Sequence, residues 1–209
     1  MAVKVKICGI TSVKDALAVS SSGADAIGLV FYPKSSRYLS IAQATEICAA
    51  LPPFISVVGL FLDASQAEVE AVLEQVPLDL LQFHGSESPQ YCAIFSRPYI
   101  KAVGMIGLDD FALYADQYPD AKAFLVDGHA PGAAGGTGNS FDWNEIPDDY
   151  PKPIILAGGL NPDNIAAAIQ STDVYAVDLS SGVEISAGIK SEEKIKALMQ
   201  EVKRVEHSE

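Results

Sequence analysis

Short runs of β-branched and other apolar residues alternate along the chain with longer runs in which apolar residues recur every three or four positions. The short runs start about 20 to 30 residues apart, which is the length of one strand, one helix and two loops. Several of them, such as Ile55–Leu62, are apolar on both faces, as is typical of parallel strands covered by helices on both sides. The pattern predicts eight strands, at Val3–Cys8, Asp25–Phe31, Ile55–Leu62, Leu78–Phe83, Tyr99–Val103, Ala123–Asp127, Pro153–Ala157 and Val174–Leu179.

The longer runs predict amphipathic helices between these strands. In Ser65–Val76 the apolar residues recur at i, i+3, i+4 and i+7. Ser65 and Glu68 have the spacing of a capping box at the start of this helix. The last predicted helix, Ser191–Val205, carries the same apolar stripe.

Two further segments carry signals for helix boundaries. Asn161 followed by Pro162 predicts an N-cap with proline at the first helical position. The stretch after Asp127 is rich in glycine, and only a short turn near Trp143–Ile146 is expected to be helical there.

Eight strand-and-helix units in 209 residues predict a (β/α)₈ barrel. No linker, low-complexity tract or change of composition interrupts the chain, so residues 1–209 are expected to form one domain. The main alternative is an open doubly wound sheet. Its dinucleotide fingerprint should follow the first strand, but that strand ends in CGITS with a single glycine.

The composition excludes several kinds of partner. With 27 acidic and 14 basic residues the formal net charge is −13, and no segment supplies a basic stripe. Nucleic acid and anionic membranes are therefore not expected as partners. Hydrophobic residues make up 49% of the chain and charged residues 20%, which favours a globular protein with a large core. The start, MAVKVKICGI, has no continuous apolar segment like that of a secretory signal, so a cytoplasmic location is expected.

The cysteines and histidines give no sign of a metal site. Cys8, Cys48 and Cys92 are far apart in the sequence and predict neither a disulfide framework nor a zinc site. Cys48 and Cys92 fall within predicted helices and are expected to be packing residues. Only His84 and His129 lie near the expected mouth of the barrel, so no metal is expected.

Glycine-bearing loops follow the last three predicted strands. In this fold the active site lies at the carboxyl ends of the strands, and the loops after strands seven and eight usually hold phosphate. Loop six reads GHAPGAAGGTG, loop seven AGGLN and loop eight SSG. Glycine lets backbone N–H groups approach an anion closely, although such loops can also be simple tight turns. The predicted phosphate-binding residues are Gly158, Gly159, Ser180, Ser181 and Gly182.

Two strand ends carry candidate acid–base groups. Cys8 ends the first strand, where a helix beginning near Thr11 could lower the pKa of the thiol, although a lone cysteine is more often a buried apolar residue. Asp127 ends the apolar strand AFLVD, and burial at the barrel mouth would suit it as a general acid. Asp178 ends the eighth strand and either acts on the substrate or orders the following loop. Lys6 is expected to point the same way as Cys8, because side chains alternate along a strand.

Two more residues have both a structural and a functional interpretation. Arg37, in FYPKSSRYLS, is either a surface arginine or a guanidinium fork for a substrate carboxylate. His84, in LLQFHG, is either a core histidine or a ligand-binding residue.

Seven segments together resemble the phosphoribosylanthranilate isomerase family of tryptophan biosynthesis. The resemblance covers essentially the whole chain in the same order, and the combination is more specific than any one motif. The segments are KICGIT at 6–11, SSRYLS at 35–40, LLQFHG at 80–85, VDG at 126–128, GGTGNSFDW at 135–143, LAGGLNPDN at 156–164 and DLSSGVE at 178–184.

The resemblance implies a substrate, a reaction and a set of roles. The substrate would be the phosphosugar N-(5-phosphoribosyl)anthranilate, and the reaction its Amadori rearrangement to an aminoketose. Asp127 would be the acid and Cys8 the base, with neither metal nor cofactor. Arg37 would bind the anthranilate carboxylate, while Gln82, His84 and Asp178 would line the pocket. Whether the protein is a monomer or a homodimer stays open.

Three other functions remain to be distinguished. A metal-dependent pentose-phosphate epimerase would need histidines and aspartates at several strand ends. An indoleglycerol-phosphate synthase would need lysine and glutamate inside the mouth, and no matching glutamate is evident at a strand end. A non-catalytic phosphosugar-binding barrel would keep the glycine loops but would need neither Cys8 nor Asp127.

Overall fold

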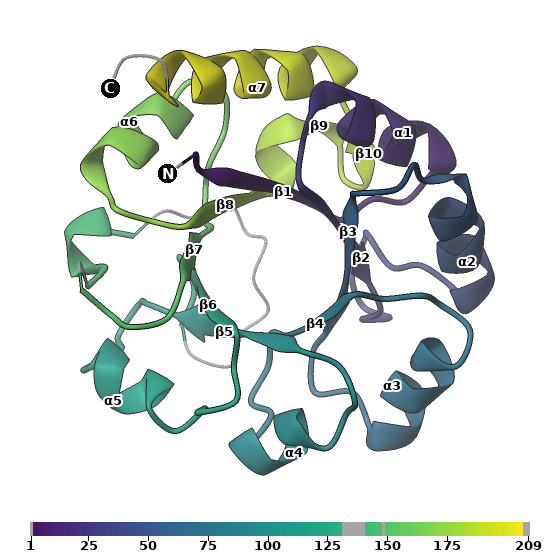
Figure 1. The fold of residues 1–209 in the computed structure, drawn as a ribbon, viewed down its shortest axis with the longest axis horizontal. Helices are drawn as coiled ribbons and strands as arrows, with labels where there is room; N and C mark the ends of the chain where they lie inside the picture. The colour runs from purple at the N-terminus through teal and green to yellow at the C-terminus, as the bar shows by residue number, and fades with distance from the viewer. Residues whose placement is uncertain (1, 131–140, 148, 207–209) are drawn as a thin grey trace.

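Eight parallel strands form a closed barrel, each hydrogen-bonded to the next and the last to the first, in the computed structural model (Figure 1). The structure describes residues 2–130, 141–147 and 149–206. The predicted (β/α)₈ barrel is therefore confirmed, and the open doubly wound sheet is excluded. The strands are β1 (Lys4–Cys8), β2 (Ala26–Val30), β3 (Ser56–Phe61), β4 (Leu80–Phe83), β5 (Tyr99–Gly104), β6 (Ala123–Asp127), β7 (Ile154–Leu156) and β8 (Ala176–Leu179).

Helices surround the barrel on its outer side, and α7 lies beside α1 and α6 (Figure 1). Two single-turn 3₁₀ helices and a small antiparallel hairpin complete the described elements. The helices are α1 (Val13–Ser22), α2 (Ile41–Ala50), α3 (Gln66–Leu73), α4 (Pro89–Ala93), α5 (Phe111–Ala115), α6 (Ile165–Ser171), α7 (Glu192–Glu206), η1 (Trp143–Glu145) and η2 (Ser181–Val183), and the hairpin is β9 (Glu184–Ser186) with β10 (Ile189–Lys190).

Local sequence signals explain the start of α3 but not that of α6. The capping box of α3 is confirmed: the Ser65 hydroxyl accepts from the Glu68 N–H, and the Glu68 carboxylate accepts from the Ser65 N–H. The predicted N-cap at Asn161 is wrong, because α6 begins at Ile165 with Asn164 as its cap residue. The Asn161 side chain instead accepts from the backbone N–H of Asp163 at 2.8 Å, which closes a turn ahead of the helix.

The segment after β6 has little regular structure among its described residues. As expected, one turn of 3₁₀ helix, η1, is found at Trp143–Glu145. Residues 131–140, which hold the GGTG part of the family motif, lie outside the described residues. None of the described helices is long and apolar enough to cross a membrane.

Apolar side chains form two layers, one on each side of the barrel wall. The outer layer packs strands against helices and includes Phe61, Phe83 and Phe124, all at most 1% exposed. The inner layer fills the barrel with smaller residues, among them Val58 and Leu125. Cys48 and Cys92 lie in α2 and α4 and pack against the outer layer, as predicted. Because the interior is filled, the open space lies at the ends of the strands.

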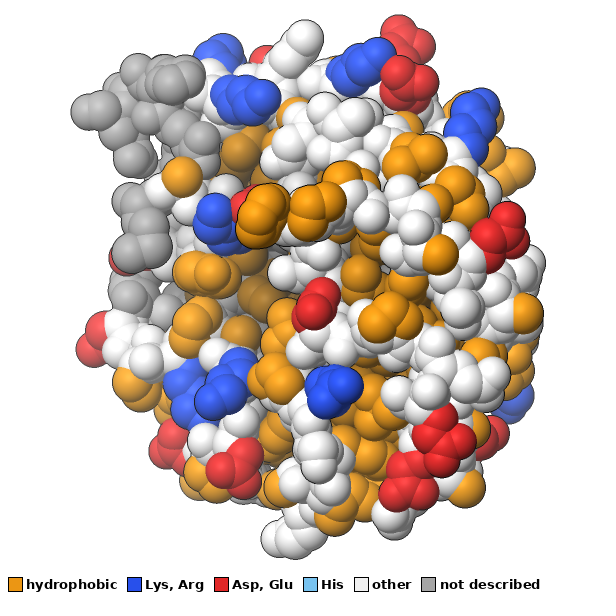
Figure 2. Space-filling view, turned by 45° about the vertical axis from the view of Figure 1, so that its right-hand side comes forward, with side chains coloured by type: hydrophobic (Ala, Val, Ile, Leu, Met, Phe, Trp, Pro, Cys, Tyr) orange, Lys and Arg blue, Asp and Glu red, His pale blue; other side chains and the backbone are white. Residues whose placement is uncertain are grey.

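On the face that Figure 2 turns to the viewer, charged side chains lie in small groups. Figure 2 shows acidic and basic groups separated by hydrophobic and uncharged surface on the face turned to the viewer. The net charge of −13 is therefore not gathered into one field on that face.

Candidate active site

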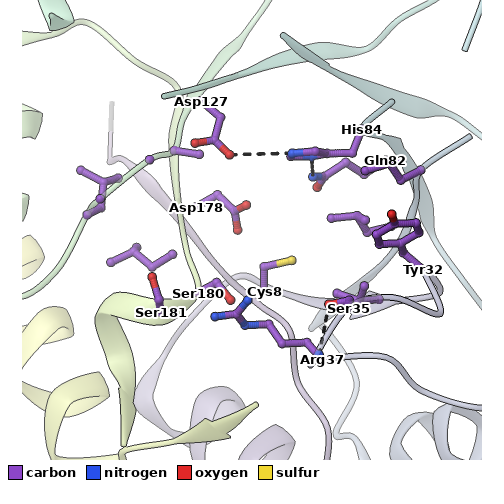
Figure 3. A pocket seen from close by; sticks show the side chains of 18 residues that line it. Cys8, Tyr32, Ser35, Arg37, Gln82, His84, Asp127, Asp178, Ser180 and Ser181 are labelled. Atoms are coloured by element: carbon purple, nitrogen blue, oxygen red, sulfur yellow. Dashed lines mark hydrogen bonds and ion pairs between the residues drawn. The ribbon is translucent and has the colours of Figure 1, made fainter. Parts of the chain in front are cut away.

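One cavity lies at the carboxyl ends of the strands, where the sequence predicts the site (Figure 3). Every predicted site residue except Gly182 lines it. The lining residues are Cys8, Val30, Tyr32, Ser35, Arg37, Leu60, Leu62, Gln82, His84, Asp127, Ala157, Gly158, Gly159, Leu160, Asp178, Leu179, Ser180 and Ser181.

Cys8 ends β1 and pairs in register with Gly28 of β2. A Cβ atom on Gly28 would lie 2.5 Å from the Cys8 Sγ, so this glycine makes room for the thiol. Burial raises the pKa of the Cys8 thiol, and the nearby charges of Lys6 and Lys190 offset that rise only in part. The prediction of a pKa lowered by a helix start is therefore wrong, since α1 begins only at Val13 and burial dominates.

Lys6 points into the barrel beneath Cys8, as the alternation of side chains along β1 predicts. Its Nζ donates to Asp178 Oδ1 at 2.9 Å, and the two side chains are only 5% and 9% exposed. Burial lowers the pKa of Lys6, but the Asp178 carboxylate outweighs this, so the net shift is upward. The ion pair fixes Asp178 at the cavity wall and keeps a positive charge near the thiol.

Asp127 ends β6, and its carboxylate faces His84 on the side of the cavity away from Cys8 (Figure 3). Its Oδ2 lies 3.8 Å from His84 Nε2 and 3.8 Å from His129 Nε2. Burial, helped by nearby positive charges, lowers the pKa of His84 to about 3, so its ring is neutral at pH 7. The Nδ1 of the same ring lies 3.1 Å from the Gln82 amide nitrogen, which orients it.

The side chain of Arg37 reaches the cavity from the loop after β2 and is 15% exposed. Its Nε and Nη2 donate to the two carboxylate oxygens of Glu184, each at 2.8 Å. Lys190 Nζ donates to the same carboxylate at 2.8 Å. A Cβ on Gly9 would overlap the Arg37 side chain, so the glycine after Cys8 is needed for this packing. Glu184 therefore positions the guanidinium, a role that the sequence pattern does not indicate.

The glycines of the two predicted phosphate loops differ in what they do. Gly158 and Gly159 have φ of +88° and +66°, a region that favours glycine, and both line the cavity beside the serine pair of loop eight. Gly182 does not line the cavity. A Cβ there would overlap the carbonyl oxygen of Leu160, so this glycine allows loops seven and eight to pack together.

A buried lysine–glutamate pair lies outside the cavity and was not predicted. Lys101 of β5 and Glu87, in the loop after β4, are 3.0 Å apart (Nζ to Oε2) and at most 2% exposed. Lys101 also donates to the Gly85 carbonyl at 2.6 Å, and Glu87 accepts from the Asp63 N–H at 2.9 Å. The pair ties together the loops after β3 and β4 and does not supply the lysine and glutamate that a synthase would need in the mouth.

Fold and cavity together define a (β/α)₈-barrel enzyme with its site at the carboxyl ends of the strands. A family model described as N-(5'phosphoribosyl)anthranilate (PRA) isomerase matches residues 5–201. By this match the chain belongs to the N-(5'-phosphoribosyl)anthranilate isomerase family, whose members act in tryptophan biosynthesis.

Relatives and solved structures agree with the family. The N-(5'-phosphoribosyl)anthranilate isomerase of Pseudomonas fluorescens is 55% identical over 207 residues, 99% of each chain. The crystal structure of phosphoribosyl anthranilate isomerase from Thermotoga maritima has a TM-score of 0.88 and 40% identity, covering 97% of this chain and 99% of that one. A phosphoribosyl anthranilate isomerase in complex with reduced 1-(o-carboxyphenylamino)-1-deoxyribulose 5-phosphate has a TM-score of 0.80 and 36% identity over 97% and 99% of the two chains.

Proposed function

We propose that the chain converts N-(5-phospho-β-D-ribosyl)anthranilate into 1-(2-carboxyphenylamino)-1-deoxy-D-ribulose 5-phosphate, with Asp127 as general acid and Cys8 as general base. The observation that carries this proposal is the position of the two groups. One thiol and one carboxylate end β1 and β6 and line the same cavity, so they can reach different atoms of one sugar. Acid–base catalysis at two atoms of a substrate needs such a separated pair.

In the first step Asp127 gives a proton to the ring oxygen of the ribose. The bond between this oxygen and C1′ breaks, and the nitrogen lone pair forms a C=N double bond, which leaves an open-chain Schiff base. The carboxylate that remains faces the neutral His84 ring, which adds no charge of its own.

In the second step the Cys8 thiolate removes the proton from C2′. The C–H electrons form a C1′=C2′ double bond and neutralise the iminium nitrogen, giving an enolamine. In the tautomerisation to the ketone the Asp127 carboxylate takes the enol proton and the Cys8 thiol gives its proton to C1′, which restores both groups to their starting states. Because burial raises the thiol pKa, the charges of Lys6 and Lys190 are needed to support the thiolate.

The remaining predicted residues bind and orient the substrate. Arg37, held by Glu184, would receive the anthranilate carboxylate on the free part of its guanidinium. The loops after β7 and β8 would hold the phosphate through backbone N–H groups, as is usual in this fold. The product analogue bound by a family member carries both anionic groups that these residues would bind.

These assignments account for the reaction without a metal ion or an organic cofactor. The proton transfers use Asp127 and Cys8, which both line the cavity. We expect the enzyme to work in the cytoplasm. The epimerase, the synthase and the non-catalytic barrel are all disfavoured by the family match.

The test is to measure the activity of the Cys8→Ala and Asp127→Asn variants, using the loss of substrate fluorescence to monitor the reaction. Each variant should lose roughly 10²–10⁴-fold or more in kcat while its thermal unfolding stays near that of the wild type. Cys48→Ala, which removes a thiol from α2, should keep full activity. Wild-type kcat/KM in Cys8→Ala would show that the base is another group.

A further inference from the structure

Two buried imidazole nitrogens point at one carboxylate in this cavity. His84 Nε2 and His129 Nε2 each lie 3.8 Å from Asp127 Oδ2, and their rings are 5.0 Å apart between centroids. The two side chains are only 8% and 4% exposed. Among the described residues neither nitrogen has a hydrogen-bond partner, and such buried orphan groups are rare in folded proteins.

The other nitrogen of each ring already has the kind of partner that prepares a histidine to bind a metal. His129 Nδ1 lies 2.8 Å from the Ala130 carbonyl oxygen and donates to it, which leaves the lone pair on Nε2. His84 Nδ1 faces the Gln82 amide at 3.1 Å, and the Gln82 Oε1 is itself without a partner in the described structure. Rotating the Gln82 amide by half a turn places its Oε1 next to His84 Nδ1. His84 Nδ1 then donates a hydrogen bond to this oxygen, and the lone pair of the ring lies on Nε2.

We propose that His84, His129 and Asp127 bind a divalent transition-metal ion of the zinc type. Their ligand atoms all lie within 4.8 Å of one another. Ligands of four-coordinate Zn²⁺ lie about 2.0–2.2 Å from the ion, which sets them about 3.3–3.5 Å apart. The two separations of 3.8 Å from Asp127 need to close by only a few tenths of an ångström, and the third, between the two imidazole nitrogens, is within 4.8 Å. Two imidazoles and one carboxylate are a common donor set for this ion, and the fourth position would face the cavity.

The charge around the cluster allows a cation to bind. The nearest lysines, Lys6 and Lys101, are each neutralised by a carboxylate at 2.9 and 3.0 Å. Binding of the ion would release the acid proton of Asp127, and the carboxylate so formed would offset part of the charge of the ion.

The bound ion would be an inhibitor and not a cofactor. It would occupy the carboxylate that the proposed function uses as its acid, so Zn²⁺ should inhibit turnover and a chelator should restore it. This inhibition rests on the proposed function, whereas the binding does not. If the protein binds Zn²⁺ but its turnover is not inhibited, the metal site is supported and the assignment of Asp127 as the general acid is contradicted.

The experiment is titration of the metal-free full-length protein with Co²⁺ and Zn²⁺, by visible absorption and calorimetry. The wild type should bind one ion with the absorption of tetrahedral Co²⁺. His129→Gln and His84→Gln, which alter different elements, should each weaken binding at least tenfold. The matched control is His207→Gln, which changes the chain's third histidine, a residue outside the described ones, and should leave the affinity unchanged.

The same titration can also give results that would contradict the proposed metal site. Loss of binding in Cys8→Ser with full binding in His129→Gln would place the ion on the thiol instead. Loss of binding in His207→Gln, or no binding by the wild type, would equally overturn the proposal. Thermal unfolding of each variant separates a lost ligand from a lost fold.

Discussion

Gly28 lies directly beside Cys8 across the β1–β2 pairing, and a Cβ atom on it would be 2.5 Å from the thiol sulfur. The substitution Gly28→Ala should therefore push the thiol away from its place in the cavity. We expect a loss of at least tenfold in kcat and a destabilisation of about 1–3 kcal/mol from overpacking. Steady-state kinetics and denaturant unfolding measure the two effects.

The matched control for this prediction is Gly59→Ala in β3. There the added Cβ would meet the Leu78 side chain and not Cys8, so stability should fall while kcat is retained. An equal loss of kcat in both variants would mean that overpacking of the barrel, and not displacement of the thiol, causes the effect.

Glu184→Gln should weaken substrate binding more than it slows the reaction. The change keeps the shape of the side chain but removes the charge that holds Arg37 at two points. We expect KM to rise about tenfold, equal to about 1.4 kcal/mol, with a smaller change in kcat. Glu192→Gln, which breaks an exposed ion pair with Lys196, is the control and should change neither constant. A fall in kcat alone would argue against Arg37 as a binding residue.

The same carboxylate should make stability depend on pH in the acid range. Burial raises the pKa of Glu184, but hydrogen bonds from Arg37 and Lys190 outweigh it, so the net pKa lies below the ordinary glutamate value. Its contribution is complete above the unfolded pKa of about 4.3 and is lost as the pH falls through the lower native pKa. Tm measured from about pH 6 to pH 3 should thus fall less steeply in Glu184→Gln than in the wild type. Parallel curves would refute this assignment.

Lys6→Met should destabilise the protein strongly, because it leaves the buried Asp178 carboxylate without its partner. Breaking one side of a buried ion pair costs about 3–5 kcal/mol. The double variant Lys6→Met with Asp178→Leu should recover much of that loss, since no unpaired charge remains. Urea unfolding of the three proteins measures the coupling, and a simple sum of the single effects would show that the two side chains do not interact.

The Cys8 thiol should react slowly with neutral alkylating reagents, since burial raises its pKa. At pH 8 we expect iodoacetamide to label Cys8 more slowly than a free thiol, and the rate should still be rising at about pH 9. Mass spectrometry distinguishes Cys8 from Cys48 and Cys92. Rapid labelling of Cys8 that is already at its maximum near pH 7 would mean that the thiolate is formed in the resting protein.

The strands and most site residues could be predicted because their signals are local. Each observed strand, such as β3 at Ser56–Phe61, lies within two residues of the boundaries expected from its apolar run. The carboxyl ends of the strands in a barrel then bring Cys8 and Asp127 to one cavity. The start of α6 was misplaced because Asn161 closes a turn, and the turn and the N-cap use the same residue type.

Sequence patterns do not show which residues pair with each other when they are far apart in the chain. Glu184 meets Arg37 across 147 positions, and nothing near either residue indicates the partner. Gly28 has an ordinary place inside a strand, and its role appears only when β2 lies beside β1. The convergence of His84 and His129 on Asp127 likewise depends on how β4 and β6 are placed in the barrel, and the sequence does not indicate it.

In the proposed mechanism Asp127 opens the ring and Cys8 then removes the C2′ proton. The most direct test is the isotope effect on kcat/KM with substrate deuterated at C2′, measured in Asp127→Asn, Cys8→Ser and the wild type. Slowed ring opening in Asp127→Asn should bring the isotope effect close to one, while slowed proton removal in Cys8→Ser should express it in full. A full isotope effect in Asp127→Asn with none in Cys8→Ser would contradict the assignment of the two roles.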